Sequence, residues 1–450
     1  MRLPSEWARC MQTCLGPDYG AFEQALLGRR TWGLRFNPLR GDPPALPWAL
    51  RPVGWCAQGR TYEGDKVHPG RHVWHDAGVY YIQEPSAMAV AEVADVQPGM
   101  RVLDLCAAPG GKATHLAGKL AGEGLLVANE PVPSRAAQLA GNLERMGARN
   151  AVTLCEWPER LAQRWPAAFD RVVVDAPCSG EGLFRREPEA ARQWSTEAVE
   201  ACAARQRTIL EAAATLTAAG GRLVYATCTF ERAEDEDNVD WFLSTHPDFA
   251  PVEVELPGWR PGLMGQTHCA RLWPQSGLGE GHFLAAFERL DGAPALPWTQ
   301  ERQLGTHTMP EWLELWQAYT DEPPPEQVAC HGDRRTWLPA GCPSLEGLRV
   351  IRAGLLTAQA VRGRLVPQHA LAMAVPGREP VDLELEDPAL ARYLAGETLP
   401  TESRGWVQVR AGGYPIGLGK GAGGILKNHI PTGLRHRGRL RDWNDVERGD

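Results

Sequence analysis

The segment from Met100 to Leu120, MRVLDLCAAPGGKATHLAGKL, constrains the fold more than any other part of the chain. Val102–Leu105 form a short apolar run that suits a buried strand, Ala107–Gly111 form a turn of small residues, and Lys112–Leu120 have a helical pattern. A strand, a glycine-rich turn and a helix in this order open nucleotide-type α/β domains. The turn is not G-x-G-x-x-G, which argues against a dinucleotide as the ligand.

A second strand follows this helix and ends in an acidic residue. Gly124–Asn129 is followed by Glu130, at the spacing where a carboxylate reaches the ribose hydroxyls of a bound nucleoside. Gly110 and Gly111 would let the backbone approach such a ligand without a Cβ in the way. We therefore expect an adenosine-bearing cofactor here, and a purely structural turn is the alternative.

The stretch RVVVDAPCSGEG, from Arg171 to Gly182, begins with an apolar run typical of a strand buried on both faces of a parallel sheet. The run stops at Asp175, and proline and glycine then prevent regular structure. Asp175 and Cys178 are thus expected at the carboxyl end of a buried strand, where open α/β sheets bind their ligands. The alternative is an ordinary strand exit with a small buried cysteine.

Helices and strands alternate in the rest of this region. Arg135–Met146 is expected to be a helix, Ala151–Leu154 a short strand, and Glu189–Ala219 one long helix that ends at a Gly-Gly pair. The acidic run Glu231–Asp240 is expected to begin another helix, where its charge suits the helix dipole. HCARLWPQSGLGEGHFLAAFERL, ending near Leu290, would add a hairpin-like pair that closes the sheet.

A second cysteine follows the expected strand Leu223–Ala226, in the sequence YATCTF. Cys228 would therefore lie at the same sheet edge as Cys178. A thiolate can add to an electron-poor ring carbon such as pyrimidine carbon 6, which makes carbon 5 nucleophilic toward a sulfonium methyl group. Asp175 could stabilise a proton near ring nitrogen 3, and the second thiol could help to expel the first. Isolated buried cysteines are usually inert, but two at adjacent strand ends favour this chemistry.

The residues before about position 85 have the composition of a small accessory region. Glu6–Leu15 and Asp18–Gly28 are expected to form two short amphipathic helices. Trp32 and Phe36 could stack on bases, although single aromatic residues more often belong to a core. GVYYIQEPSAM, from Gly78 to Met88, predicts a strand and a helix cap that could line a cofactor pocket.

Length and composition limit the remaining possibilities. A chain of 450 residues is expected to form two or three domains. Its 11 cysteines include no C-x-x-C pair, so we expect neither a metal centre nor a disulfide framework. This cysteine usage is typical of a protein in a reducing cytoplasm. No apolar run approaches the ~20 residues that span a bilayer, and the N-terminus lacks a signal-peptide core. With a net charge of −8, any nucleic acid must be bound by a local basic face.

The composition changes after Leu290. Residues 291 to about 339 are rich in proline and tryptophan, with Pro323–Pro325 predicting a linker and Trp312 and Trp316 expected to pack on a helix. From Leu345 onward short β-like runs alternate with glycine, which predicts a small barrel. Between Arg404 and Arg441 the chain has no Asp or Glu. Its basic residues are expected to contact phosphates, with a solvated basic surface as the alternative; they are Arg404, Arg410, Lys420, Lys427, Arg435, Arg437, Arg439 and Arg441.

VLDLCAAPGGK, DAPCSGEG and YATCTF, in this order and spacing, resemble the motifs of the Nop/Sun-type RNA cytosine-C5 methyltransferases. The resemblance covers about Gly78 to Leu290 and is specific, because cysteines in both the P-C-S and T-C-T motifs distinguish that family. It implies a Rossmann-like domain that uses S-adenosylmethionine. The segment GYPIGLGKGAGGILKNHIPTGLR also resembles the PUA-like module of a bacterial 16S ribosomal RNA member.

Carried over motif by motif, the resemblance implies that Cys228 is the covalent nucleophile and that Cys178 assists release of the product. Asp175 would contact the cytosine and the cofactor side of the pocket, with Lys112 beside it. Spacing alone does not decide which thiol attacks, since the P-C motif of DNA cytosine-C5 methyltransferases would favour Cys178. The residues expected to line the cofactor are Cys106, Ala107, Ala108, Pro109, Gly110, Gly111, Lys112, Glu130, Arg135 and Asp175.

The chain departs from the family pattern after the third strand. Many members carry an Asp there that holds the adenine amine, whereas this chain has Leu154-Cys155-Glu156-Trp157. Either Glu156 substitutes for that residue or the adenine is held without a side-chain carboxylate.

These expectations describe an RNA-binding N-terminal region at 1–85, a Rossmann-like methyltransferase domain at 86–290, a linker or helical segment at 291–340 and a PUA-like RNA-binding domain at 341–441. The expected function is methylation of cytosine carbon 5 in 16S ribosomal RNA, free or in the 30S subunit, by a cytoplasmic monomer without membrane contact. Methylation of transfer RNA and a non-catalytic role in ribosome assembly are the alternatives. Amino-methylating RNA enzymes usually carry N/D-P-P-Y/F where this chain has Asp175-Ala176-Pro177-Cys178, which argues against them.

Overall fold

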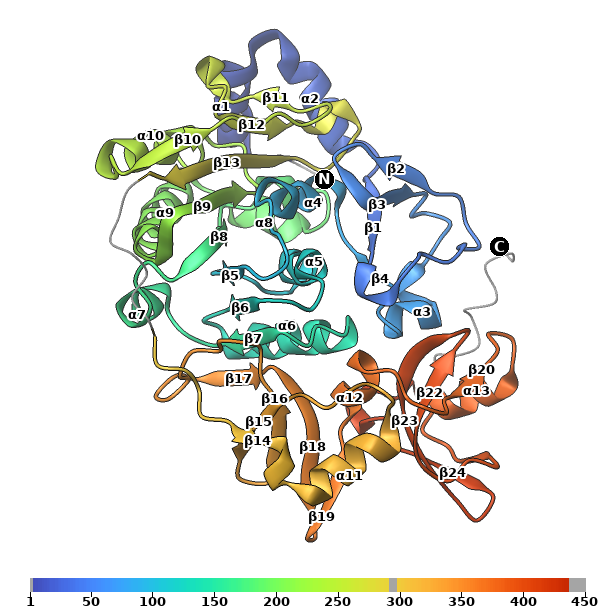
Figure 1. Ribbon diagram of the computed structural model, residues 1–450. Helices are drawn as coiled ribbons and strands as arrows, with labels where there is room; N and C mark the ends of the chain where they lie inside the picture. The colour runs from blue at the N-terminus through green and yellow to red at the C-terminus, as the bar shows by residue number, and fades with distance from the viewer. Residues whose placement is uncertain (1–2, 291–297, 437–450) are drawn as a thin grey trace.

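The computed structural model describes residues 3–290 and 298–436. Its centre is a ten-stranded sheet in the order β11-β12-β13-β9-β8-β5-β6-β7-β17, with β10 paired to β13 (Figure 1). Five neighbouring strands are parallel: β5 (Arg101–Asp104), β6 (Leu125–Asn129), β7 (Ala151–Leu154), β8 (Phe169–Asp175) and β9 (Thr217–Thr227). The strand order reverses between β5 and β8, so a ligand-binding crevice is expected outside their carboxyl ends. This is the Rossmann-like arrangement that the sequence predicts.

Helices cover both faces of the sheet because its parallel strands are apolar on both sides. Along β8, Val173 packs in one core cluster and Val172 and Val174 in another, and none of the three is exposed. The helices of the first cluster are α4 (Pro85–Val93), α5 (Gly111–Leu120) and α6 (Pro133–Arg145). Those of the second are α7 (Pro158–Arg164), α9 (Thr196–Leu216) and α10 (Glu236–Thr245).

Most elements predicted for this region are confirmed. The parallel strands and the helices α5 and α6 lie where the sequence places them, although β9 begins at Thr217, well before the expected start at Leu223. The expected hairpin-like pair is β12 (Cys269–Leu272) and β13 (His282–Arg289), which run antiparallel to each other. β13 also pairs antiparallel with β9 and so extends the sheet. The short strand β10 (Phe249–Val252) pairs with β13, and β11 (Arg260–Pro261) pairs with β12.

The prediction of one long helix over 189–219 is wrong. The stretch forms two helices, α8 (Pro188–Gln193) and α9, because Trp194 and Ser195 are both extended. The Trp194 indole donates a 2.8 Å hydrogen bond to Glu181, and the Ser195 hydroxyl accepts from a backbone amide of the first turn of α9. The tryptophan is therefore directed into a neighbouring loop, and the serine caps a new helix.

The ends of two further helices also differ from expectation. α9 stops at Leu216, before the Gly-Gly pair, because Thr217 is already extended and Gly220 and Gly221 lie in an irregular part of β9. The acidic run does not begin a helix at its first residue, since α10 starts only at Glu236. Glu234 and Asp235 precede the helix and are fully buried, so they interact with the interior of the protein.

The N-terminal region has the two predicted helices, α1 (Ser5–Leu15) and α2 (Tyr19–Leu27). They pack against the loops after β8 and β9, with Phe22 and Phe230 in edge contact at 5.1 Å and Trp7 and Phe184 at 5.3 Å. Phe36 is buried, so it belongs to a core as the commoner interpretation held. The remaining elements are α3 (Val73–Asp76) and a sheet of β2 (Arg51–Val53), β3 (Cys56–Tyr62), β1 (Trp32–Phe36) and β4 (Tyr80–Ile82).

The C-terminal part is β-rich, as the sequence predicts, and its strands divide among three sheets. β17 (Val350–Ala353) pairs antiparallel with β7 and so joins the central sheet. A second sheet holds β14 (Leu304–Gly305), β15 (Gln327–His331), β16 (Arg334–Trp337), β18 (Leu355–Val361) and β19 (Arg364–Pro367). A third holds β20 (Val381–Leu383), β22 (Gly405–Ala411), β23 (Tyr414–Ala422), β24 (Ile425–Asn428) and β21 (Leu399–Pro400).

Three helices accompany these sheets: α11 (Pro310–Tyr319), α12 (His369–Ala374) and α13 (Pro388–Leu394). Trp312 and Trp316 on α11 are fully buried, which confirms that they pack rather than recognise a ligand. Of the basic C-terminal residues, Arg404, Lys420 and Lys427 are exposed, whereas Arg437, Arg439 and Arg441 lie outside the described residues. Among the described helices, none combines the length and apolarity needed to cross a membrane.

Candidate active site

The two cysteines singled out in the sequence come together at the carboxyl edge of the sheet. Cys178 follows β8 and Cys228 follows β9, and their Sγ atoms are 3.3 Å apart. Both residues are half-buried. The hydrogen bond to Cys228 and burial raise the pKa of the Cys178 thiol well above its usual value. Cys178 therefore keeps its proton at neutral pH and can donate it toward the Cys228 sulfur.

An ion pair lies beside the thiols. Lys112, at the start of α5, places its Nζ 2.6 Å from the Asp175 Oδ2 atom at the end of β8. Burial disfavours the charged lysine, but the carboxylate of Asp175 and the nearby Cys228 outweigh it, so the pKa of Lys112 is raised. The predicted catalytic residues Cys178, Cys228, Asp175 and Lys112 are thus neighbours.

The turn between β5 and α5 is supported by α6. Arg135 donates a 3.1 Å hydrogen bond to the Ala108 carbonyl, and Asn142 donates a 2.8 Å bond to that of Pro109. Gly110 has a φ of 114°, which a residue with a Cβ rarely adopts. Ala107 and Ala108 are buried, and burial raises the pKa of the half-buried Cys106 thiol. Helix α6 therefore holds this turn, and a Cβ at Gly110 would meet Leu139 and Asn142 of that helix.

Buried acids flank the turn on both sides. Asp104 at the end of β5 is fully buried, and burial together with the charge of Asp175 raises its pKa to about 8. At the end of β6, Glu130 accepts a 3.0 Å hydrogen bond from the Val132 amide and lies 3.4 Å from Arg135. A cationic ligand with ribose hydroxyls suits this donor and acceptor set, because a positive charge would stabilise the ionised Asp104. S-adenosylmethionine carries a sulfonium and an ammonium group and fits this description.

Glu156, the residue considered for the adenine amine, is engaged elsewhere. Its side chain is 4% exposed, accepts a 2.6 Å hydrogen bond from the Arg349 amide and pairs with Arg160 at 3.1 Å. The Cys155 amide in turn donates to the Arg349 carbonyl. Glu156 thus joins the end of β7 to the segment that leads into β17.

Sequence reasoning missed a histidine at the site. His282, the first residue of β13, is buried, and its Nε2 atom lies 3.8 Å from Asp175 Oδ1. Burial and the charge of Lys112 lower the pKa of His282 to about 3, so the ring is neutral. Its only sequence signal is a polar residue that opens the otherwise apolar run HFLAAF.

Sequence reasoning also missed the buried polar residues behind the thiol loops. Gln206 on α9 and Glu234 after β9 contact the Cys178 loop, and Glu181 in that loop contacts the residues after Cys228. The acidic run was interpreted as helix-dipole charge, and the helical pattern around Gln206 does not mark it as buried. Only the tertiary structure reveals these contacts.

Among the described residues, one group of possible metal ligands lies away from Cys178 and Cys228. Donor atoms of Cys56, Glu92 and His115 lie within 4.8 Å of one another. His115 Nε2 is 3.1 Å from one Glu92 oxygen, and Lys119 Nζ is 2.6 Å from the other. The protein itself thus provides partners for both carboxylate oxygens, and we assign the group to the joint between β3 and helices α4 and α5.

Four family models match successive parts of the chain. The model described as 16S rRNA methyltransferase RsmB/F matches residues 91–288, and that of the N-terminal domain of 16S rRNA methyltransferase RsmF matches residues 3–85. The RsmF rRNA methyltransferase first C-terminal domain matches residues 312–375, and the methyltransferase RsmF PUA domain matches residues 380–436.

Similar proteins span most of the chain. Ribosomal RNA small subunit methyltransferase F of Escherichia coli O157:H7 is 33% identical over 431 residues, which cover 87% of this chain and 86% of that protein. The protein of the same name from Escherichia fergusonii is 32% identical over 433 residues, or 88% and 87% of the two chains.

Solved structures share the fold of the central region. A methyltransferase homolog protein from Pyrococcus horikoshii is 24% identical with a TM-score of 0.57, over 64% of this chain and 95% of that one. NSun6 from Pyrococcus horikoshii with SFG, an S-adenosylmethionine analogue, is 18% identical with a TM-score of 0.57, over 64% and 99%.

Proposed function

Because the chain belongs to the RsmF family of ribosomal RNA small subunit methyltransferases and depends on S-adenosylmethionine, we propose that it methylates carbon 5 of cytosine in 16S ribosomal RNA. The observation that carries the proposal is the pair of thiols 3.3 Å apart beside the ion pair of Lys112 and Asp175. Methylation of an amino group needs no thiol, whereas methylation of a pyrimidine carbon requires a nucleophile at carbon 6.

The first step is addition of a thiolate to carbon 6. We assign the attack to Cys228, as the resemblance to the Nop/Sun-type enzymes implies, and the ammonium of Lys112 lies near enough to interact with this sulfur. The new bond between sulfur and carbon 6 shifts the ring electrons toward carbon 5 and nitrogen 3. Asp175, held by Lys112 and close to the neutral His282, is placed to stabilise the proton at nitrogen 3.

The second step joins a methyl group to carbon 5, and release follows. The turn from Cys106 to Lys112 would hold S-adenosylmethionine, whose sulfonium would supply the methyl group while the electrons of the sulfur–methyl bond stay on the cofactor sulfur. Carbon 5 then loses its proton to water, and the electron pair of that bond forms the double bond between carbons 5 and 6, which expels the Cys228 sulfur. Cys178 lies close enough to protonate the departing thiolate.

The RNA is bound by surfaces outside this crevice. The target cytosine must leave its stack before carbon 6 can meet a thiolate, at a cost of a few kcal/mol. Exposed Arg404, Lys420 and Lys427 in the PUA-like sheet offer charges for phosphates, and Lys420 lies over the ring of Trp406 at 4.9 Å. We propose a cytoplasmic monomer that acts on the 30S subunit or its RNA.

The test is transfer of a labelled methyl group to 30S subunits, naked 16S RNA and transfer RNA, followed by digestion to nucleosides. We expect 5-methylcytosine in ribosomal RNA and none in transfer RNA. Label in transfer RNA alone would overturn the substrate assignment, and label on a base amino group would overturn the chemistry. Absence of transfer to any RNA, with the cofactor bound, would favour a non-catalytic assembly role.

A further inference from the structure

The two thiol loops are joined by buried carboxylates that cross from one loop to the other. Glu234 follows Cys228 in the chain and accepts hydrogen bonds from the amide of Ser179, the residue after Cys178, at 3.1 and 3.3 Å. Glu181 follows Cys178 and accepts a 2.9 Å hydrogen bond from the amide of Phe230, two residues after Cys228. Each loop therefore supplies the carboxylate that orients the other.

A second partner fixes each carboxylate. The Gln206 side-chain amide donates to Glu234 at 2.7 Å and to the Pro177 carbonyl at 3.0 Å, so it connects α9 with both thiol loops. The Trp194 indole donates to Glu181 at 2.8 Å. Both carboxylates belong to residues with no exposed surface. A buried carboxylate held by two donors has little freedom, so its backbone partner is held as well.

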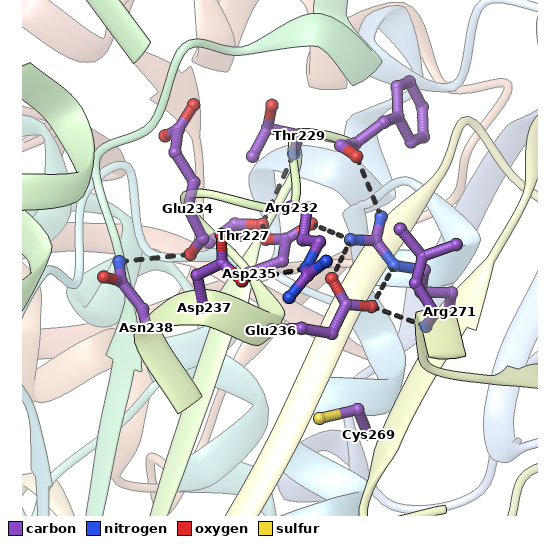
Figure 2. A network of polar contacts seen from close by, with 12 residues as sticks. Thr227, Thr229, Arg232, Glu234, Asp235, Glu236, Asp237, Asn238, Cys269 and Arg271 are labelled. Atoms are coloured by element: carbon purple, nitrogen blue, oxygen red, sulfur yellow. Dashed lines mark hydrogen bonds and ion pairs between the residues drawn. The ribbon is translucent and has the colours of Figure 1, made fainter. Parts of the chain in front are cut away.

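The neighbouring arginine does not neutralise Glu234. Figure 2 shows the Arg271 guanidinium between Asp235 and Glu236, with the Glu234 side chain directed away from it. Burial raises the pKa of Glu234 to about 7 despite its hydrogen bonds. Burial of this carboxylate is costly, but an apolar side chain in its place would leave the Ser179 amide and the Gln206 side chain without an acceptor.

Two direct contacts show that the loops lie against each other along their length. The hydroxyls of Ser179 and Thr229 are 2.7 Å apart, and the Gly182 amide donates a 2.7 Å hydrogen bond to the Cys228 carbonyl. A Cβ at Gly182 would lie 2.7 Å from that carbonyl oxygen, so only glycine permits the approach. The distance between the sulfur atoms is therefore set by a small number of contacts.

We propose that Glu234 and Glu181 are separate positioning residues for the two chemical steps, with Glu234 placing Cys178 for release and Glu181 placing Cys228 for attack. The proposal rests on the proposed function, because it assigns each carboxylate to a thiol of that reaction. It predicts that loss of either carboxylate impairs a different step, although both are buried in the same cluster.

The first experiment compares Glu234→Ala with Glu234→Gln on the full-length protein with its ribosomal substrate. Glu234→Ala should reduce turnover by about tenfold or more and increase the fraction of protein bound covalently to RNA, because Cys178 is misplaced for release. Glu234→Gln keeps a carbonyl that accepts from the Ser179 amide and should stay within about threefold of wild type. Covalent RNA is measured on denaturing gels, and cofactor affinity serves as the control for folding.

The second experiment makes the corresponding changes at Glu181. Glu181→Ala should slow formation of the covalent species by about tenfold without increasing its steady level, because Cys228 is misplaced for attack. Glu231→Gln is the matched control. It removes a carboxylate from the same cluster whose Oε1 atom has no hydrogen-bond partner in the described structure, and it should leave both measurements unchanged.

Two results would overturn the proposal. In the first, both alanine variants bind cofactor normally and keep wild-type turnover. In the second, both lose turnover and covalent RNA in equal measure, as expected of a purely structural cluster. Wild-type protein that never forms a covalent RNA species, even with 5-fluorocytosine at the target, would refute the proposed function and this inference with it.

Discussion

The carboxyl ends of β8 and β9 differ sharply from that of β7, although all three lie along one edge of the same sheet. At the ends of β8 and β9 the chain delivers Asp175, which pairs with Lys112, and the thiols of Cys178 and Cys228, whose sulfur atoms are 3.3 Å apart. Beyond β7 it delivers Glu156, whose carboxylate is occupied by the Arg349 amide and Arg160.

The difference lies in what covers each strand end. The loops after β8 and β9 are held by the buried side chains of Gln206, Glu234 and Glu181 and are packed against α1 and α2. Their two thiols are half-buried. β7 is the edge of the parallel set, and β17 pairs with it and carries the chain into the C-terminal sheets. A polar residue at a strand end is thus available for chemistry only where no further element takes its hydrogen bonds.

The strongest test of this comparison is Cys228→Ala. Without the nucleophile no bond to carbon 6 forms, so we expect turnover and covalent RNA to fall below detection. Cofactor binding should be retained because the turn after β5 is untouched. Methyl transfer and trapped RNA are measured together. Persistence of the covalent species in this variant would show that the other thiol attacks.

Cys178→Ala tests the second thiol at the same strand edge. Attack by Cys228 remains possible, but release lacks its proton donor, so covalent protein–RNA should accumulate while turnover falls by about 10² or more. The species is detected as a shifted band on a denaturing gel. Loss of that band in Cys178→Ala, with the band kept in Cys228→Ala, would reverse the two roles.

Asp175→Asn tests the carboxylate that ends β8. The change removes the partner of Lys112 and the group placed near nitrogen 3, so we expect kcat to fall by about 10² to 10³. The pKa of Lys112 should also fall, since the Asp175 carboxylate is a cause of its elevation. The pH dependence of kcat would report this shift. A variant with wild-type kcat would exclude Asp175 from the reaction.

The sequence predicts the central fold because its elements carry strong local signals. Apolar runs such as 172–174 allow few alternatives to a buried parallel strand, and the spacing of the strands then brings Asp175 and two cysteines to one edge. The prediction of one long helix is wrong at Trp194, because this residue is extended and its indole donates a hydrogen bond to Glu181 in the preceding loop. No local pattern contains that information.

The residues of the candidate site also divide into those that local sequence predicts and those that only the tertiary structure reveals. Residues that must follow a strand, such as Cys228, could be placed from sequence, whereas His282 and Glu181 could not. His282 enters the site only because β13 lies beside β9, and Glu181 because its loop contacts Phe230. The role of Glu156 stayed open in the sequence because the segment that binds it is almost 200 residues away in the chain.

Glu156→Ala probes the contrasting strand end. Removing the carboxylate leaves the Arg349 amide without its partner at the joint of β7 and β17, so the free energy of unfolding should fall by about 1–3 kcal/mol. Cofactor affinity and kcat should stay within about twofold of wild type. Denaturant unfolding and equilibrium binding provide the two measurements. A loss of cofactor affinity at unchanged stability would instead make Glu156 the adenine contact.

The smallest expected effect is a pH dependence of stability that comes from the acids behind the catalytic loops. Burial and the charges of Glu181 and Glu234 raise the pKa of Glu231 to about 8, against 4.5 in an exposed chain. The folded state therefore holds a proton that the unfolded state releases, and the free energy of unfolding falls as the pH rises from about 4.5 through 8.

Glu231→Gln cannot ionise and should lose less stability over this range. We expect the variant to match wild type at pH 5 and to exceed it at pH 8.5 in denaturant unfolding. The full shift would correspond to about 4 kcal/mol. Because Glu231 is partly exposed, solvent screening should reduce the difference to about 1 kcal/mol. Parallel curves for the two proteins would mean that Glu231 is solvated and that burial at this strand end is looser than at β7.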